Sequence, residues 1–209
     1  AYFIASQYDV KSLVDSENNY TQLAQEWMTK AAEMQYPQAM YDLGEMLESE
    51  EKDLEALNWY QKAAEFGVAD ALEKIAYFHI KGLGGLSKDC HEAYKWYEKA
   101  ELYEHKLALN DHAWALATSA YKVCRSPEKA LRLISKLITL YKQEFSFIPT
   151  AVLDTQAAVY AGVSDFNRAI EIQKLAIESL GENHEKLESY QQRLKTYQQR
   201  KAWIQTKDM

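Results

Sequence analysis

A pattern of alanine and aromatic residues recurs three times in the first half of this chain. Its tryptophans are Trp27, Trp59 and Trp96, which are separated by 32 and 37 residues. Three alanines, Ala39, Ala71 and Ala108, are separated by the same 32 and 37 residues. Because two independent features shift by identical amounts, the pattern is an internal repeat, and repeats of this length are typical of stacked helical hairpins.

The repeat is clearest between residues 53 and 67. Leu54, Leu57, Tyr60 and Ala64 recur at the spacing of one helical face, with Ala56 and Ala63 beside them. The alanines would let a second helix approach closely, and we expect Trp59 and Tyr60 to be buried where the two helices diverge. Gly67 stands where a helix commonly ends in a left-handed residue.

The same reasoning predicts the helices on either side. Residues 1–19 are expected to form an N-terminal capping helix, followed by helices at 20–35, 38–49 and 70–81. Glycines at 82, 84 and 85 interrupt the chain, but they follow a helix rather than a strand, which argues against a dinucleotide-binding loop. Asp89 is predicted to cap the next helix, with Glu92 completing a capping box.

These motifs resemble those of the Sel-one-like repeat family over residues 20–106. The shared motifs are Ala-x-x-x-Leu-Gly, Gly-x-Gly-Gly-Leu-x-x-Asp and Ala-x-x-Trp-Tyr-x-Lys-Ala-Ala-Glu-x-Gly. The resemblance implies an α/α solenoid related to the tetratricopeptide repeat. Residues 107–182 are similar to tetratricopeptide repeats themselves, through Ala157, Tyr160, Ala169 and Ala176, with Asp165 as a helix cap.

The last segment, 183–209, is predicted to be a C-terminal cap with a helix over 183–205, because Leu187, Tyr190, Leu194 and Tyr197 fall on one face. The expected fold is therefore all-α: an α/α superhelical solenoid of antiparallel helix pairs with capping helices at both ends. Terminal repeats of such arrays need a polar outer surface, which this segment supplies.

The net charge and the hydropathy of the chain limit the kinds of partner that it is expected to bind. The chain has a net charge of −7, which disfavours nucleic acid, and it has no apolar stretch of membrane-spanning length. Residues 185–209 are the exception, with six basic and three acidic side chains. This basic segment is most simply a solvated face; the alternative is a contact with a partner, including a second copy of the chain.

No set of residues predicts catalysis, a cofactor or a metal site. The five histidines have no metal-ligand spacing beside paired carboxylates, and the sequence has no nucleophile-elbow, zinc-protease or phosphate-loop motif. We therefore expect a protein that is not an enzyme.

The resemblance to tetratricopeptide arrays implies that the first helix of each pair lines a concave groove. Taking Gly44, Ala76, Ala113 and Ala157 as equivalent positions predicts which residues face it. The predicted groove residues are Gln38, Tyr41, Glu45, Asp70, Glu73, Tyr77, Asn110, Trp114 and Asp154. Aromatic side chains among carboxylates suit a basic or amphipathic peptide, although Tyr77 and Trp114 could equally pack between repeats.

Two functions remain open at this stage. The favoured one is a scaffold that binds a protein or peptide in its concave groove. The alternative is an adaptor or regulatory repeat domain that only positions a larger assembly, such as a secretion, envelope or signalling component.

Cys90 and Cys124 are either two buried thiols or one disulfide. The first residue is Ala1 rather than Met, which fits a mature exported protein and equally a trimmed chain. The compartment stays open, with an exported or periplasmic location favoured over a cytoplasmic one.

Thiol counting under denaturing, non-reducing conditions tests the cysteine pairing. An exported protein should contain a Cys90–Cys124 bridge and no reactive thiol, because disulfides persist in oxidising compartments. Two reactive thiols in protein recovered from the periplasm would contradict this expectation.

Overall fold

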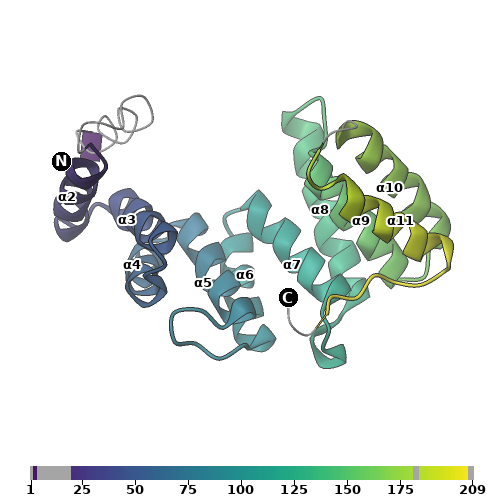
Figure 1. Cartoon of the computed structure of the whole chain (residues 1–209), viewed down its shortest axis with the longest axis horizontal. Coiled ribbons are helices and arrows are strands. Elements are labelled where there is room, and N and C mark those ends of the chain that lie inside the picture. The colour runs from purple at the N-terminus through teal and green to yellow at the C-terminus, as the bar shows by residue number, and fades with distance from the viewer. Residues whose placement is uncertain (1, 4–19, 181–183, 207–209) are drawn as a thin grey trace. The chain divides into compact units, whose positions relative to one another are not determined.

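The computed structural model describes residues 2–3, 20–180 and 184–206. These residues form ten α-helices, one short 3-10 turn and connecting turns, and the described part contains no strand. Successive helices pack as antiparallel pairs, so the all-α repeat solenoid is confirmed (Figure 1). The chain divides into two compact units, Ala1–His105 and Lys106–Met209, which are described separately below.

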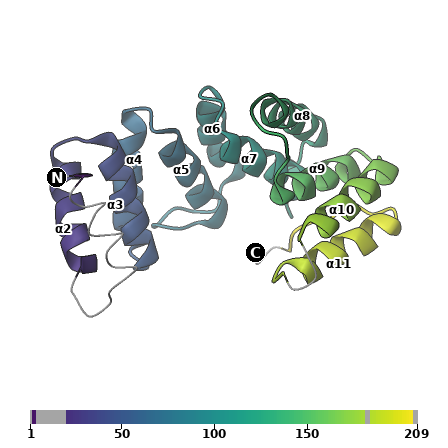
Figure 2. The same ribbon diagram turned by 90° about the horizontal axis from the view of Figure 1, so that it is seen from above.

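The first unit is a row of helices in which each packs on its neighbour in sequence, as Figure 2 shows for α2 to α5. Its helices are α2 (Tyr20–Glu33), α3 (Pro37–Ser49), α4 (Asp53–Glu65), α5 (Ala69–Lys81) and α6 (Cys90–Glu101). The turns between α2, α3, α4 and α5 are short. Gly67 takes a φ of +78° just after α4, as its position predicted.

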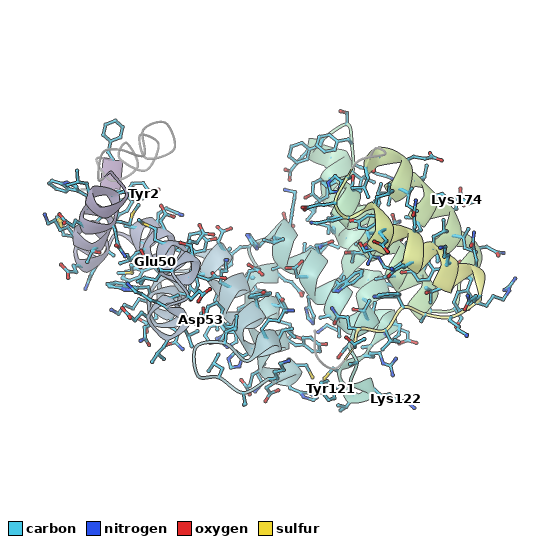
Figure 3. The ribbon with its side chains drawn as sticks, in the orientation of Figure 1. Tyr2, Glu50, Asp53, Tyr121, Lys122 and Lys174 are labelled. Atoms are coloured by element: carbon cyan, nitrogen blue, oxygen red, sulfur yellow. The ribbon has the colours of Figure 1, made fainter. Side chains whose placement is uncertain are left out.

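The second unit contains the two longest helices of the described residues, α8 with 18 residues and α10 with 15, and it begins with a longer connection than the first unit does. Its elements are α7 (Lys106–Thr118), η1 (Lys122–Cys124), α8 (Pro127–Glu144), α9 (Thr150–Gly162), α10 (Phe166–Leu180) and α11 (Leu187–Gln198). Tyr121 and Lys122 are exposed on the connection between α7 and α8 (Figure 3). Asp165 caps α10, because its Oδ1 accepts a hydrogen bond of 3.2 Å from the Arg168 backbone N–H.

Helices α3 and α4 pack closely at Gly44. A Cβ built on Gly44 would lie 2.5 Å from Cε1 of Tyr60, so only glycine fits beneath this ring. The ring cannot easily move, since it is fully buried and its hydroxyl donates a hydrogen bond of 2.6 Å to Glu48. Gly44 therefore sets how closely the two helices pack.

The buried face of α4 differs in part from the predicted one. Leu57, Tyr60 and the small residues Ala56 and Ala63 are buried, as expected. The prediction for Leu54 is wrong, because its side chain is 61% exposed. The sequence alone gives the direction of the apolar face, but not which edge of that face a neighbouring helix covers.

The repeated tryptophans are half-buried rather than fully buried. Trp27, Trp59 and Trp96 lie at the edge of the core, and each carries the lysine three residues further on over its ring. The fully enclosed aromatic residue of the second repeat is instead Tyr60. Its equivalent in the third repeat, Tyr97, is buried as well.

Only half of the predicted capping box forms at the start of α6. Asp89 Oδ1 accepts hydrogen bonds from the backbone N–H groups of His91 and Glu92, at 2.8 and 3.2 Å. The return bond is absent because the Asp89 N–H donates to the His79 carbonyl, and the Glu92 carboxylate pairs with Lys95. The glycine-rich connection is thus anchored to the end of α5.

The predictions for the two chain ends have different outcomes. The N-terminal capping helix over residues 1–19 lies outside the described residues, apart from Tyr2 and Phe3. The C-terminal helix is shorter than the predicted 183–205. It ends at Gln198, after which Arg200 takes a φ of +54° and the chain continues without helix to 206.

Two substitutions on α4 test which aromatic residue supports the first unit. Tyr60→Ala should lower the free energy of unfolding by about 3–5 kcal/mol, because it empties a fully buried site. Trp59→Ala should cost less, about 1–2 kcal/mol, since that ring lies at the edge of the core and is only partly buried. Urea unfolding followed by circular dichroism measures both, and a larger loss for Trp59→Ala than for Tyr60→Ala would contradict this assignment.

Candidate functional site

Six of the nine predicted groove residues lie in the first unit, on helices α3 and α5. We refer to them as the α3/α5 face: Gln38, Tyr41, Glu45, Asp70, Glu73 and Tyr77. Their spacings of three and four residues keep each helix's members on one side. The other three predicted residues, Asn110, Trp114 and Asp154, lie in the second unit.

Tyr41 is the centre of the α3/α5 face. Its ring lies 5.7 Å from that of Tyr60, so its inner edge packs on the core. Burial raises the pKa of its hydroxyl far above the ordinary value, and a hydrogen bond to Glu45 and the charges of Asp70 and Glu73 raise it further. The structure therefore brings three carboxylates from two helices around one tyrosine.

The three carboxylates differ in how accessible they are. Glu45 and Asp70 are about half exposed, at 48% and 50% of their side chains. Asp70 Oδ1 lies 2.9 Å from Nε2 of His105, at the end of the unit. Glu73 is only 4% exposed, so it acts on its surroundings through its charge rather than by direct contact with a ligand.

Lys74 and Glu48 border the α3/α5 face and were not predicted from the sequence. Lys74 Nζ lies 2.9 Å from Glu48 Oε2 and 3.9 Å from Glu45 Oε1. Burial lowers the pKa of Lys74, but the bond to Glu48 and the charges of Glu45 and Glu73 outweigh it and raise the pKa overall. One lysine thus faces several carboxylates, and the α3/α5 face stays acidic.

The two outer members of the face have local partners. Gln38 Nε2 donates a hydrogen bond of 2.8 Å to Asp42 Oδ1, one turn further along α3. Tyr77 is half-buried and packs against the core, with Phe78 beside it and Lys81 Nζ 5.9 Å from its ring centre. Tyr77 therefore contributes to the core of the first unit, and part of the ring remains accessible.

In the second unit, Asp154 lies inside the core rather than on an open face. It is 6% exposed, and its Oδ1 accepts hydrogen bonds of 2.8 Å from Arg193 Nε and from Gln173 Nε2. Burial raises the pKa of the Asp154 carboxyl, and the charge of Arg193 and these two hydrogen bonds oppose the rise. Gln173 also donates to the Tyr190 carbonyl, at 3.2 Å. Asp154 is therefore already paired within the chain.

Arg193 is enclosed by aromatic rings. Its guanidinium carbon lies 5.5 Å from the ring centre of Trp114, 4.6 Å from Tyr190 and 5.8 Å from Trp203. The side chain is 8% exposed. The structure thus joins two predicted groove residues, Trp114 and Asp154, through an arginine that was expected to lie on a solvated face.

The chain beyond α11 completes this arrangement. The segment after Gln198 returns to the end of α7, where the Gln205 N–H donates a hydrogen bond of 2.8 Å to the Thr118 carbonyl (Figure 1). Trp203, on the way, packs against the cluster around Tyr197. Asn110 stands apart from these contacts and donates to Asp111 at 3.0 Å.

Sequence signals for the unpredicted residues exist in part. Arg193 lies three residues after Tyr190 and four before Tyr197, so it shares their helix face. Gln173 lies between Ala169 and Ala176 at the same helical spacing. Both positions indicate burial, but an arginine or a glutamine is assigned to solvent by default.

The remaining polar groups of interest do not form a reactive cluster. Cys90 is the first residue of α6 and Cys124 the last of η1, and their pairing remains a prediction. Among the described residues, no group of three or more His, Cys, Asp or Glu side chains is placed to hold a metal ion. No described helix is both long enough and apolar enough to cross a membrane.

Comparison with known proteins identifies the repeats. The family model described as Sel1 repeat matches residues 15–36, 37–67 and 69–101. These are the segments that contain the predicted Sel-one-like motifs. A search of the curated proteins found no significant match.

Solved structures extend the similarity in fold beyond the matched repeats. A Sel1 repeat protein from Oxalobacter formigenes is 26% identical, with a TM-score of 0.63 over 85% of this chain and 71% of that one. A protective antigen of uropathogenic Escherichia coli strains, described as displaying an SLR fold, is 19% identical. It aligns with a TM-score of 0.55 over 95% of this chain and 50% of the antigen.

Proposed function

Because the chain is a Sel1 repeat protein, with these repeats across residues 15–101, we propose that it is a non-enzymatic scaffold that binds a protein or peptide segment. The observation that carries the proposal is the environment of Tyr41. An aromatic ring anchored on the core stands among the carboxylates of Glu45, Asp70 and Glu73.

This environment favours a basic or amphipathic segment. Aromatic side chains supply contact area at low entropic cost, and they are frequent among the residues that dominate binding energy. The half-exposed carboxylates of Glu45 and Asp70 would attract lysine or arginine side chains and raise the rate of association. Lys74 offsets part of this negative charge, since it lies near Glu48 and Glu45. A single lysine among these carboxylates still leaves the face with a net negative charge.

Groups on and beside the α3/α5 face support its exposed members. Glu73 adds negative charge from beneath the surface, and Tyr60 and Glu48 fix the position of α3 against α4. A rigid, preorganised surface loses little entropy when a partner binds.

The alternative is an adaptor domain that positions a larger assembly without capturing a peptide on the α3/α5 face. This alternative stays open because the chain aligns with only half of the Escherichia coli antigen, which shows that such an array can be part of a longer protein. It would bind through other surfaces, and the experiment below separates the two.

Charge reversal on the α3/α5 face tests the proposal. The probes are labelled peptides of equal length, one set rich in lysine and leucine and one rich in glutamate and leucine, measured by fluorescence anisotropy. The wild-type chain should bind the basic set, with an affinity that falls as salt is added. Glu45→Lys with Asp70→Lys should weaken this binding about tenfold, equivalent to about 1.4 kcal/mol.

A matched control uses Glu55→Lys with Glu65→Lys, which makes the same charge change at exposed positions of α4. This control should bind the basic peptides within about twofold of wild type, given the small effect of exposed charges. Equal losses in both double variants, or a preference for the acidic peptides, would refute the α3/α5 face as the binding site. Substitution of Glu73 or Asp154 is unsuitable, because both are buried.

A further inference from the structure

The second unit contains a complete recognition site for an arginine side chain, and that site is already filled. Its carboxylate is Asp154 on α9, and one of its aromatic walls is Trp114 on α7. Its occupant is Arg193, which comes from the segment at the end of the chain. A cation over several aromatic rings with a carboxylate partner suits a guanidinium better than the more strongly hydrated ammonium.

The occupying segment is attached at several separate points. Arg193 and Tyr190 belong to α11, Trp203 belongs to the non-helical stretch after it, and Gln205 bonds to the last residue of α7. We refer to residues 187–206 as the C-terminal segment. Its contacts follow the pattern of a bound peptide, with one buried charged anchor, an aromatic anchor ten residues later and a backbone hydrogen bond at the end.

Burial of this ion pair is an expensive way to close a repeat array. Removing two charges from water costs several kcal/mol, and apolar residues of similar size commonly stabilise a core as well or better. A capping helix needs only an apolar inner face, which Tyr190 and Tyr197 already provide. The arginine site therefore contributes specificity for one occupant beyond what capping requires.

We propose that the α7/α9 surface is a binding site for an arginine flanked by aromatic residues, that the C-terminal segment fills it in cis, and that the same segment of a second copy fills it in trans when the cis contact is released. The proposal does not depend on the α3/α5 face. It also gives the basic C-terminal segment a role in self-association.

Release of the C-terminal segment separates α11 from α10 and uncovers the part of the core formed by Ala157, Ala161 and Ala169, but it leaves α7, α8 and α9 in contact. Trp114 and Asp154 lie on α7 and α9, which pack on each other and on α8 without the C-terminal segment. The tethered segment competes with any free one at an effective concentration of roughly millimolar. Binding in trans should therefore be weak in the wild-type chain and strong once the tethered anchors are removed.

The experiment uses the full chain and a labelled synthetic peptide with the sequence of residues 187–206. The variant chain has Arg193→Gln and Trp203→Ala, which remove both anchors of its own segment. The peptide should bind this variant at least about tenfold more tightly than it binds the wild-type chain. A peptide with Arg193→Gln should bind the variant at least about tenfold more weakly than the native peptide does.

Two matched controls accompany it. A chain with Lys195→Gln and Lys201→Gln, which removes two exposed charges from the same segment, should behave as wild type. The variant chain that also carries Glu45→Lys and Asp70→Lys should bind the peptide as tightly as the variant chain without these two changes. Loss of binding in that chain, together with indifference to Arg193 in the peptide, would place the peptide on the α3/α5 face and overturn this proposal while supporting the other.

The remaining outcomes are also decisive. A well-folded variant that fails to bind the native peptide, or that binds native and Arg193→Gln peptides equally, shows that the C-terminal segment is a structural cap only. If the double variant loses its helical signal, Arg193→Lys takes its place, since it keeps a cation beside Asp154 but loses the planar fork. If that chain also unfolds, the segment is integral to the unit and the proposal is wrong.

Discussion

The contact between the Tyr60 ring and Gly44 is the constraint on which the first unit depends. A tyrosine ring fills the space that any side chain at position 44 would need, and Glu48 holds its hydroxyl. This contact draws α3 against α4. The Tyr41 ring packs on the same Tyr60 ring at 5.7 Å, so Tyr41 and Glu45 lie beside the contact, at its accessible edge. The next repeat places Ala76 and Tyr97 at the equivalent positions, both buried. The packing of α3 on α4 thus determines how the side chains at the edge of that contact are presented.

Both units place aromatic side chains and carboxylates at predicted groove positions, but the groups differ in how accessible they are. In the first unit, a tyrosine stands among carboxylates that are partly open to solvent. In the second, a tryptophan and a carboxylate at the predicted groove positions are occupied by Arg193, whose guanidinium also lies over the Trp203 ring. A family resemblance indicates an interaction scaffold, but it does not say which surface is available. The burial of Asp154, compared with the exposure of Asp70, makes that distinction.

The sequence predicted the helices of the first unit well, because the repeat spacing fixes where each helix begins and ends. Helix α3 and helix α5 start within one residue of the predicted positions. The final helix was predicted too long, since residues 199–205 contain no glycine or proline, and what holds them is a tertiary bond from Gln205 to Thr118. Arg193 was missed for a similar reason: periodicity placed it on the inner face, but only the position of Asp154 explains how a charge can be buried there.

A double-mutant cycle between positions 44 and 60 tests the central claim most directly, namely that the ring at 60 against glycine at 44 sets the helix spacing. Gly44→Ala should cost about 1–3 kcal/mol of unfolding free energy in the wild-type chain, from overpacking against Tyr60. In a Tyr60→Leu background the same change should cost almost nothing, giving a coupling energy of at least about 1 kcal/mol. Costs that add to within about 0.5 kcal/mol would contradict the account.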